Sequence, residues 1–258
     1  MKESLYFENF GKEGHPIFIC LHGLLGSSRN WRGVAKTLAN FFLVVSIDLR
    51  NHGDSFHSED ASIQAMSNDL LKWMDDQGHQ SVILCGHSLG GKVAMRLACD
   101  FPSRVEKLII ADIAPRDYPP EHHIPPLDSM LELELSSYSS RKEIDSVLAS
   151  KIPNWSFRQF LLTNLETETV GFRWKPNLKA LRQSIDELSR NPMRDNDQFT
   201  GSSLFVRGEK SGYLRTEHIP EAKKYFPNSQ FTMLPGVGHN LHVEDRGGFL
   251  KAIDEFIG

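Results

Sequence analysis

Cysteine is scarce in this chain. Three cysteines occur among 258 residues, Cys20, Cys85 and Cys99, and each lies within an apolar stretch. Their spacing matches neither a paired set of zinc ligands nor a CxxC redox motif. We therefore expect three reduced cysteines that pack in the core.

Runs of basic residues and long apolar segments are also missing. The 29 Lys and Arg residues face 33 Asp and Glu residues, a formal net charge of −4, so the chain lacks the concentrated positive field that binds phosphate backbones or anionic membranes. The first apolar run, residues 17–21, is too short to span a bilayer, and acidic residues precede it where a signal peptide needs an apolar core. We expect a cytoplasmic protein that binds neither nucleic acid nor membrane. Its oligomeric state does not follow from the sequence.

Short apolar runs alternate with amphipathic segments along the chain. Runs without polar alternation predict strands that are buried on both faces, and they lie at residues 17–21, 43–47, 82–85, 108–110, 204–206 and 231–234. Between them, Met66, Leu70 and Trp73 form one helical stripe, and Val93 and Leu97 form another. Alternating strands and helices indicate an α/β fold with a mostly parallel sheet flanked by helices.

The alternation stops after Pro115 and resumes near Gly201. The residues between have the pattern of helices and loops, with a proline-rich entry and Asn191-Pro192 at the exit. We expect an inserted helical cap at residues 115–198, on a core of residues 1–114 and 199–258. Its aromatic residues are expected mainly to pack the cap onto the core, and some could line a substrate pocket: Trp155, Phe157, Phe160, Phe172 and Trp174.

A candidate nucleophile follows the apolar run at residues 82–85. Gly86-His87-Ser88-Leu89-Gly90 leads directly into the helical stripe, and Gly-x-Ser-x-Gly between a strand and a helix is typical of a nucleophile elbow. The two glycines allow neighbouring chain to pass close to a strained turn. We expect Ser88 to be the nucleophile.

An oxyanion needs two backbone N–H donors, and two loops could supply them. His22-Gly23-Leu24-Leu25-Gly26 follows the first apolar run, and Leu89 follows the predicted nucleophile. In a strand–elbow–helix architecture one donor comes from each of these positions. We assign the donors to Leu24 and Leu89.

A general base is expected near the end of the chain. Deprotonation of a serine hydroxyl near pH 7 requires a base of matched pKa, which histidine usually provides. His239 follows the last apolar run within Pro235-Gly236-Val237-Gly238-His239 and is our candidate. His242 lies three residues on, but no HExxH pattern accompanies the pair, so we expect no metal site there.

Together these motifs resemble the α/β-hydrolase family. The resemblance covers nearly the whole chain and rests on residues 86–91, His22-Gly23, residues 48–55 and residues 236–239. Residues 50–53, 88–92 and 112–115 look most like the small bacterial YbfF-type esterases. The resemblance implies a serine esterase with a helical cap, and we take residues 48–55 as architectural, with Arg50 and His52 as buried hydrogen-bonding groups.

The acid of the triad has two candidates. The general family pattern expects a carboxylate a few residues after Gly208, but this chain has Ser211 there, and Glu209 follows the glycine directly. Asp112 ends the strand next after the nucleophile's strand and helix, so in a parallel sheet it opens onto the same edge as Ser88. The YbfF-type resemblance also favours this strand. We expect Asp112 to hold the imidazole, with Glu209 as the alternative.

The sequence therefore predicts a serine hydrolase that cleaves acyl esters of small, apolar substrates without metal or organic cofactor. A thioesterase or another acyl hydrolase with the same triad, or a ligand-binding protein that kept only the fold, are the alternatives. Gly86-x-x-x-x-Gly91-Lys92 also resembles a phosphate-binding P-loop, but Val93 stands where that loop needs Ser or Thr to bind Mg²⁺.

Overall fold

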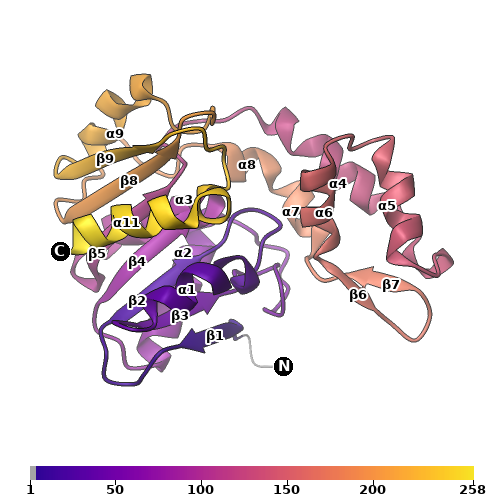
Figure 1. Ribbon diagram of the computed structural model, residues 1–258, viewed down its shortest axis with the longest axis horizontal. Helices are drawn as coiled ribbons and strands as arrows, with labels where there is room; N and C mark the ends of the chain where they lie inside the picture. Colours follow the sequence, from indigo (N-terminus) through magenta and orange to yellow (C-terminus); the bar gives the residue numbers. More distant parts are fainter. Residues whose placement is uncertain (1–3) are drawn as a thin grey trace.

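A seven-stranded sheet with helices on both faces organises the chain (Figure 1). The computed structural model describes residues 4–258, so Met1 to Glu3, the start of the segment weighed above as a signal peptide, lie outside the described residues. The strands come in the order β1-β3-β2-β4-β5-β8-β9, and every neighbouring pair is parallel except β1 with β3. The expected α/β class with a mostly parallel sheet is confirmed. The strands are β1 (Phe7–Phe10), β2 (Ile17–Leu21), β3 (Leu43–Ile47), β4 (Val82–His87), β5 (Val105–Ala111), β8 (Ser202–Gly208) and β9 (Ser229–Leu234).

All six predicted strands are present in this sheet, and its seventh strand was not predicted. β1 lies at the edge of the sheet, where Phe7 pairs with Ile47 in antiparallel register. Its sequence, Phe-Glu-Asn-Phe, is only half buried and carries no continuous apolar run, so the pattern that identified the other strands does not detect it.

Helices cover both faces of the sheet, which explains why polar and apolar residues do not alternate along its strands. In β2, Ile19 and Leu21 pack in one apolar cluster, whereas Phe18 and Cys20 pack in the cluster on the opposite face. The first face carries α2 (Ile63–Asp76), α3 (Leu89–Asp100) and α9 (Ile219–Tyr225), and the second carries α1 (Arg32–Leu38), α10 (Leu241–Glu244) and α11 (Arg246–Ile257). Successive residues of a strand point to opposite faces, so each face requires its own apolar set.

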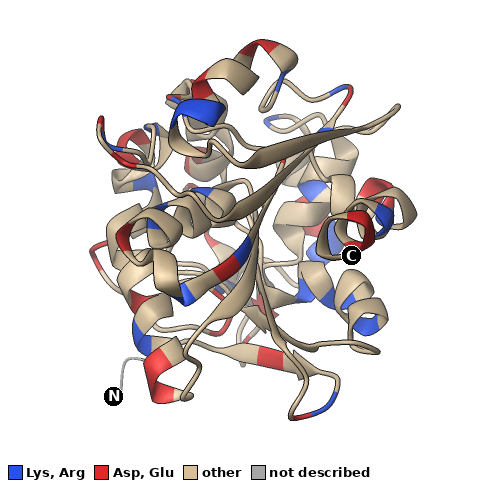
Figure 2. Cartoon of the chain, turned by 90° about the vertical axis from the view of Figure 1, so that its left-hand side faces the viewer, with Lys and Arg blue, Asp and Glu red and all other residues tan. Residues whose placement is uncertain are grey.

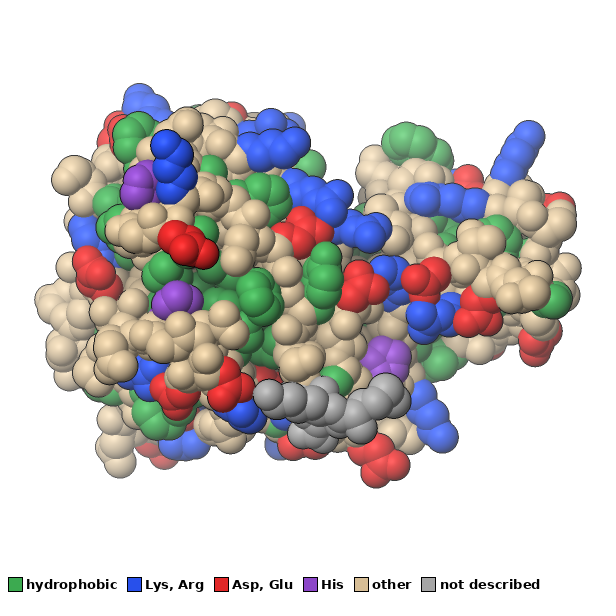
Figure 3. All heavy atoms as spheres, turned by 90° about the horizontal axis from the view of Figure 1, so that it is seen from below, with side chains coloured by type: hydrophobic (Ala, Val, Ile, Leu, Met, Phe, Trp, Pro, Cys, Tyr) green, Lys and Arg blue, Asp and Glu red, His purple; other side chains and the backbone are tan. Residues whose placement is uncertain are grey.

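Residues 115–198, the inserted segment, lie between β5 and β8 and form a smaller lobe beside the sheet (Figures 1 and 3). Its helices are α4 (Ile124–Leu131), α5 (Arg141–Ala149), α6 (Trp155–Leu162), α7 (Leu178–Gln183) and α8 (Ile185–Ser189). The segment also contains a hairpin of β6 (Leu165–Thr167) and β7 (Phe172–Trp174), which the sequence did not predict. Each of its strands has only three residues, too few for a period to be recognised.

Charged residues of both signs are interspersed over the chain (Figure 2). Among residues 4–258, no helix combines the length and the apolar character needed to cross a bilayer.

The carboxyl ends of β2, β4, β5, β8 and β9 meet at one edge of the sheet, and this is where ligands bind in open parallel sheets.

Candidate active site

Ser88 lies on a sharp turn between β4 and α3. Its backbone has φ 51° and ψ −116°, a sparsely populated conformation that costs an L-residue about 1–3 kcal/mol. Glycines make the turn possible, because a Cβ on Gly86 would overlap the carbonyl oxygen of Gly90 and a Cβ on Gly90 would lie 2.5 Å from the carbonyl oxygen of Leu21. The elbow therefore presents the Ser88 side chain to a cavity at the edge of the sheet.

His239 lies in the loop between β9 and α10, beside Asp112 at the end of β5. The imidazole Nδ1 is 2.7 Å from Asp112 Oδ2. Because a carboxylate can only accept a hydrogen bond, this contact places the proton of the neutral ring on Nδ1 and leaves Nε2 as an acceptor. The ring of Tyr213 stacks on the imidazole with centroids 3.9 Å apart, and His87 Nε2 donates to the His239 carbonyl at 2.9 Å.

Asp112 is fully buried and accepts three hydrogen bonds. The Gly208 amide donates to Oδ1 at 3.0 Å, and the Ser211 hydroxyl and the His239 imidazole both donate to Oδ2. Burial of an unpaired carboxylate is costly, so these three donors offset the loss of hydration. Asp112 itself has φ 53°, in the left-handed region that L-residues rarely adopt.

The structure brings Asp112 to His239 and places Glu209 elsewhere. Glu209 is exposed, and its Oε2 accepts a hydrogen bond from the Gly236 amide at 2.7 Å. Ser211, which stands where the general family pattern has its acid, donates its hydroxyl to Asp112 from the loop after β8. Sequence reasoning noted this serine as a departure and missed its contact. The spacing from Gly208 was the signal that could have identified it.

Leu24 and Leu89, the predicted oxyanion donors, line the same cavity as Ser88. The Gly90 amide donates to the His22 carbonyl at 3.0 Å, which joins the loop after β2 to the first turn of α3. A Cβ on Gly23 would lie 3.3 Å from the Ser88 Cβ, so this loop passes directly over the elbow. Neither the Leu24 nor the Leu89 N–H has a hydrogen-bond partner among residues 4–258.

The cavity at Ser88 is closed by core and inserted segment together. Apolar side chains form most of its walls, and five polar side chains besides Ser88 also line it: Lys92, Tyr118, His123, Ser189 and Tyr213. Burial lowers the pKa of His123 to about 4 and that of Lys92 to about 7. The apolar lining comprises Leu24, Leu89, Ile113, Ile185 and Leu188.

Three further histidines pack behind the elbow. His22 Nε2 accepts from the Leu49 amide at 3.0 Å, and its Nδ1 donates to the Gly23 carbonyl at 2.8 Å. Burial lowers the pKa of His22 to about 4 and of His52 and His242 to about 3, so all three are neutral near pH 7. His242 stacks on Trp31 with centroids 4.3 Å apart, which is a core contact.

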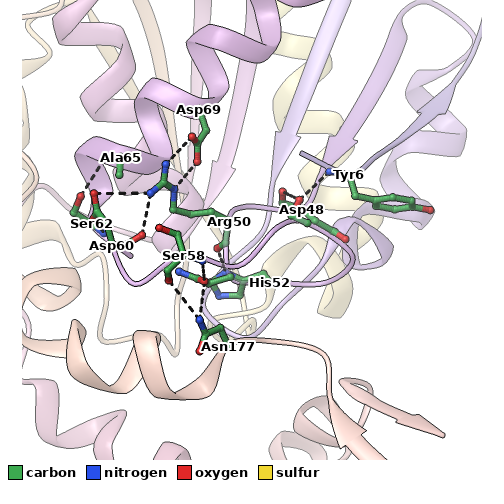
Figure 4. A network of polar contacts seen from close by, with 12 residues as sticks. Tyr6, Asp48, Arg50, His52, Ser58, Asp60, Ser62, Ala65, Asp69 and Asn177 are labelled. Carbon is green, nitrogen blue, oxygen red and sulfur yellow. Dashed lines mark hydrogen bonds and ion pairs between the residues drawn. The ribbon is translucent and has the colours of Figure 1, made fainter. Parts of the chain in front are cut away.

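The loop after β3 is held by buried polar contacts (Figure 4). Arg50 forms a bidentate pair with Asp69 at 2.5 and 2.7 Å, and the Arg50 carbonyl accepts from His52 Nδ1 at 3.0 Å. Asp48 accepts from the amides of Ser28 at 2.5 Å and Asp54 at 2.8 Å. Arg50 and His52 are thus hydrogen-bonding groups of the scaffold, as expected.

The contacts of Lys92 differ from those of a P-loop lysine. Its ammonium donates to the carbonyls of Leu188 at 2.9 Å and Arg190 at 2.7 Å, at the end of α8. A P-loop lysine instead reaches the phosphates held in its own loop. In the described part of the chain, no group of three or more His, Cys, Asp or Glu side chains is arranged to hold a metal ion.

The family model of the alpha/beta hydrolase fold matches residues 16–246 of this chain. This chain belongs to the α/β-hydrolase family. The resemblance deduced from its motifs is thereby confirmed.

Individual α/β hydrolases are similar over almost the whole chain. The sn-1-specific diacylglycerol lipase ABHD11 of Mus musculus is 36% identical, over 94% of this chain and 81% of that protein. Esterase YbfF of Escherichia coli is 28% identical, over 94% and 92%. A solved structure of a marine microorganism esterase superposes with a TM-score of 0.95 at 35% identity, covering 99% of this chain and all of that one.

Proposed function

We propose that this α/β hydrolase cleaves carboxylic esters through an acyl-enzyme on Ser88. The contact of His239 Nδ1 with Asp112 carries the proposal, because it leaves Nε2 as the acceptor of this imidazole. The ring of Tyr213, which stacks on the imidazole, lines the same cavity as the strained Ser88. The similarity to a diacylglycerol lipase and to esterases supports an ester as the substrate class.

In the proposed reaction, His239 Nε2 takes the proton of the Ser88 hydroxyl as its oxygen attacks the acyl carbonyl. Ser88 Oγ makes no side-chain hydrogen bond to the start of α3. Catalytic hydrogen bonds of a nucleophile often form only when substrate is bound. The protonated imidazole then donates to the leaving alcohol. Water, deprotonated by the same imidazole, hydrolyses the acyl-enzyme and releases the acid.

Two groups are proposed to stabilise charge during these steps. The N–H groups of Leu24 and Leu89 bind the oxyanion of each tetrahedral intermediate, and the start of α3 adds partial positive charge. Asp112 holds the imidazole tautomer and stabilises the imidazolium. A serine, an imidazole and two amide donors suffice for this chemistry, so the proposal requires no metal or organic cofactor.

We propose that the inserted segment acts as a cap that selects the substrate. α8 contributes Ile185 and Leu188 to the cavity, opposite Leu24 and Ile113 of the core. Apolar walls favour acyl groups without charge, because burial of an unpaired charge is costly. Esters with small apolar acyl groups are therefore the proposed substrates.

Labelling with a fluorophosphonate, followed by mass spectrometry, tests the nucleophile. The expected result is a single adduct on Ser88, which is absent from Ser88→Ala and strongly reduced in His239→Ala. The parent protein is expected to hydrolyse p-nitrophenyl butyrate, and the two variants are not. A folded protein that is neither labelled nor active would overturn the proposal.

A further inference from the structure

We propose that Asn164, in the inserted segment, is a positioning residue for the oxyanion loop. This inference rests on the proposed function, because it concerns the loop that supplies the Leu24 N–H. The geometry behind it is a single long-range hydrogen bond, from Asn164 Nδ2 to the carbonyl oxygen of Leu25 at 2.8 Å.

The side chain of Asn164 is held rigidly between α6 and β6. Only 4% of the residue is exposed, so its amide has no access to bulk water as an alternative partner. Nδ2 also donates to the Leu161 carbonyl at 3.2 Å, and the Asn164 carbonyl accepts from the Lys175 amide at 2.9 Å. The bond to Leu161 therefore orients the side-chain Nδ2, and the bond from Lys175 holds the Asn164 backbone that carries it.

Leu25, its partner, is in a conformation that needs support. It has φ 58°, and the left-handed region costs an L-residue roughly 1–2 kcal/mol. Leu24 and Leu25 are the central residues of a tight turn closed by the Gly26 amide, which donates to the Gly23 carbonyl at 2.9 Å. Leu25 is buried, so without Asn164 its carbonyl would lose a partner that water could not readily replace.

The Leu24 N–H belongs to the same turn, which couples its direction to Leu25. A four-residue turn has few stable combinations of central dihedral angles, so relaxation of Leu25 to negative φ changes the adjoining peptide planes as well. The hydrogen bond from Asn164 opposes that relaxation. Through it, the inserted segment contributes to the geometry in which the oxyanion is bound, in addition to covering the cavity.

Other contacts between inserted segment and core do not reach this turn. The Asn177 amide donates to the Asn51 carbonyl at 3.0 Å, and Asn177 Nδ2 lies 3.2 Å from Asn51 Oδ1, on the loop after β3 (Figure 4). Among the described residues, the hydrogen bond of Asn164 is the one that joins the inserted segment to residues 23–26. Asn177 thus offers a matched control of the same residue type.

The experiment compares Asn164→Leu, which is nearly isosteric and removes the donor, with Asn177→Leu. For p-nitrophenyl butyrate, Asn164→Leu is expected to lower kcat by roughly 10- to 100-fold with KM changed less than about 3-fold, because a misdirected oxyanion donor affects the transition state. Affinity for an alkyl boronic acid, which forms a tetrahedral adduct with the serine, should fall in parallel. Asn177→Leu should keep kcat within about 2-fold.

Asn164→Asp provides a second variant if the leucine variant does not fold. It preserves size and shape but cannot donate when ionised, so the same loss of kcat is expected at pH 8. Unchanged kcat in a folded Asn164 variant, or equal losses in the Asn164 and Asn177 variants, would overturn the inference. If the unmodified protein does not label on Ser88, the proposed function fails instead.

Discussion

Ser88 and Asp112 occupy equivalent positions on two adjacent strands. Each is the first residue after its strand, and the strands pair in register with His87 opposite Ala111. Both residues have positive φ, 51° and 53°, and both donate their amides to the next strand, Ser88 to Ala111 and Asp112 to Val206. The proposed nucleophile and the proposed acid therefore share one backbone conformation at the ends of two adjacent strands.

Replacement of each carboxylate by an amide distinguishes the two candidates for the acid that orients His239. Asp112→Asn is expected to lower kcat by roughly 10³- to 10⁴-fold, because the neutral amide can turn its NH2 towards His239 Nδ1, which favours the wrong tautomer, and carries no charge to stabilise the imidazolium. Glu209→Gln is expected to retain kcat, since the hydrogen bond of its carboxylate within residues 4–258 is with the Gly236 amide and not with His239. Steady-state hydrolysis of p-nitrophenyl butyrate measures both. The opposite pattern would transfer the role to Glu209.

Removal of the Ser211 hydroxyl should slow catalysis without abolishing it. Ser211→Ala leaves the Asp112 carboxylate with two donors in place of three, and a hydrogen bond to a charged group justifies an expected loss of about 5- to 20-fold in kcat. KM should change little. Ser211→Thr keeps a hydroxyl and should recover much of the rate. Equal rates for the alanine variant and the parent protein would show that this contact is dispensable.

Stability should decline in acid through the buried histidines. His22, His52 and His242 have folded pKa values of about 4, 3 and 3, below the usual 6.5, because burial opposes charge. The unfolded chain therefore binds more protons below pH 6.5, so the free energy of unfolding falls as the pH drops from 6.5 towards 4. Each such histidine contributes about 1 kcal/mol of this loss by pH 5.5.

Urea unfolding at pH 7.5 and pH 5.5 measures this dependence. His242→Phe removes one of the three groups while keeping a ring to stack on Trp31, so its stability should differ less between the two pH values. Identical pH dependence in parent and variant would exclude His242 as a source of the effect.

The elbow should not tolerate a methyl group at Gly86. Gly86→Ala places a Cβ against the backbone of Gly90, and backbone cannot move aside as a flexible side chain can, so a destabilisation of at least about 2 kcal/mol is expected. Gly247→Ala is the control: Gly247 is exposed in α11 with space around it and should be neutral or stabilising by about 0.5 kcal/mol. Thermal unfolding of the two variants gives the comparison, and equal melting temperatures would contradict it.

Structural features that follow from a local sequence pattern could be predicted, and features that depend on contacts between residues distant in sequence could not. The six core strands and the Ser88 turn each follow from a contiguous stretch of sequence. The choice between Asp112 and Glu209 required three-dimensional geometry, since each follows a strand that opens onto the same edge. The bond between Asn164 and Leu25 joins residues 139 positions apart, and no motif marks either partner.

The insertion between β5 and β8 also determines when the site can be completed during synthesis. The Ser88 turn depends on contacts with the His22 loop, so the chain that emerges first from the ribosome contains everything that shapes it. Every hydrogen-bond donor to the Asp112 side chain comes from residue 208 or later, after the whole inserted segment. A nascent chain therefore carries Ser88 and Asp112 through synthesis of the whole inserted segment, and gains His239 and the other donors to Asp112 only from residue 208 onward.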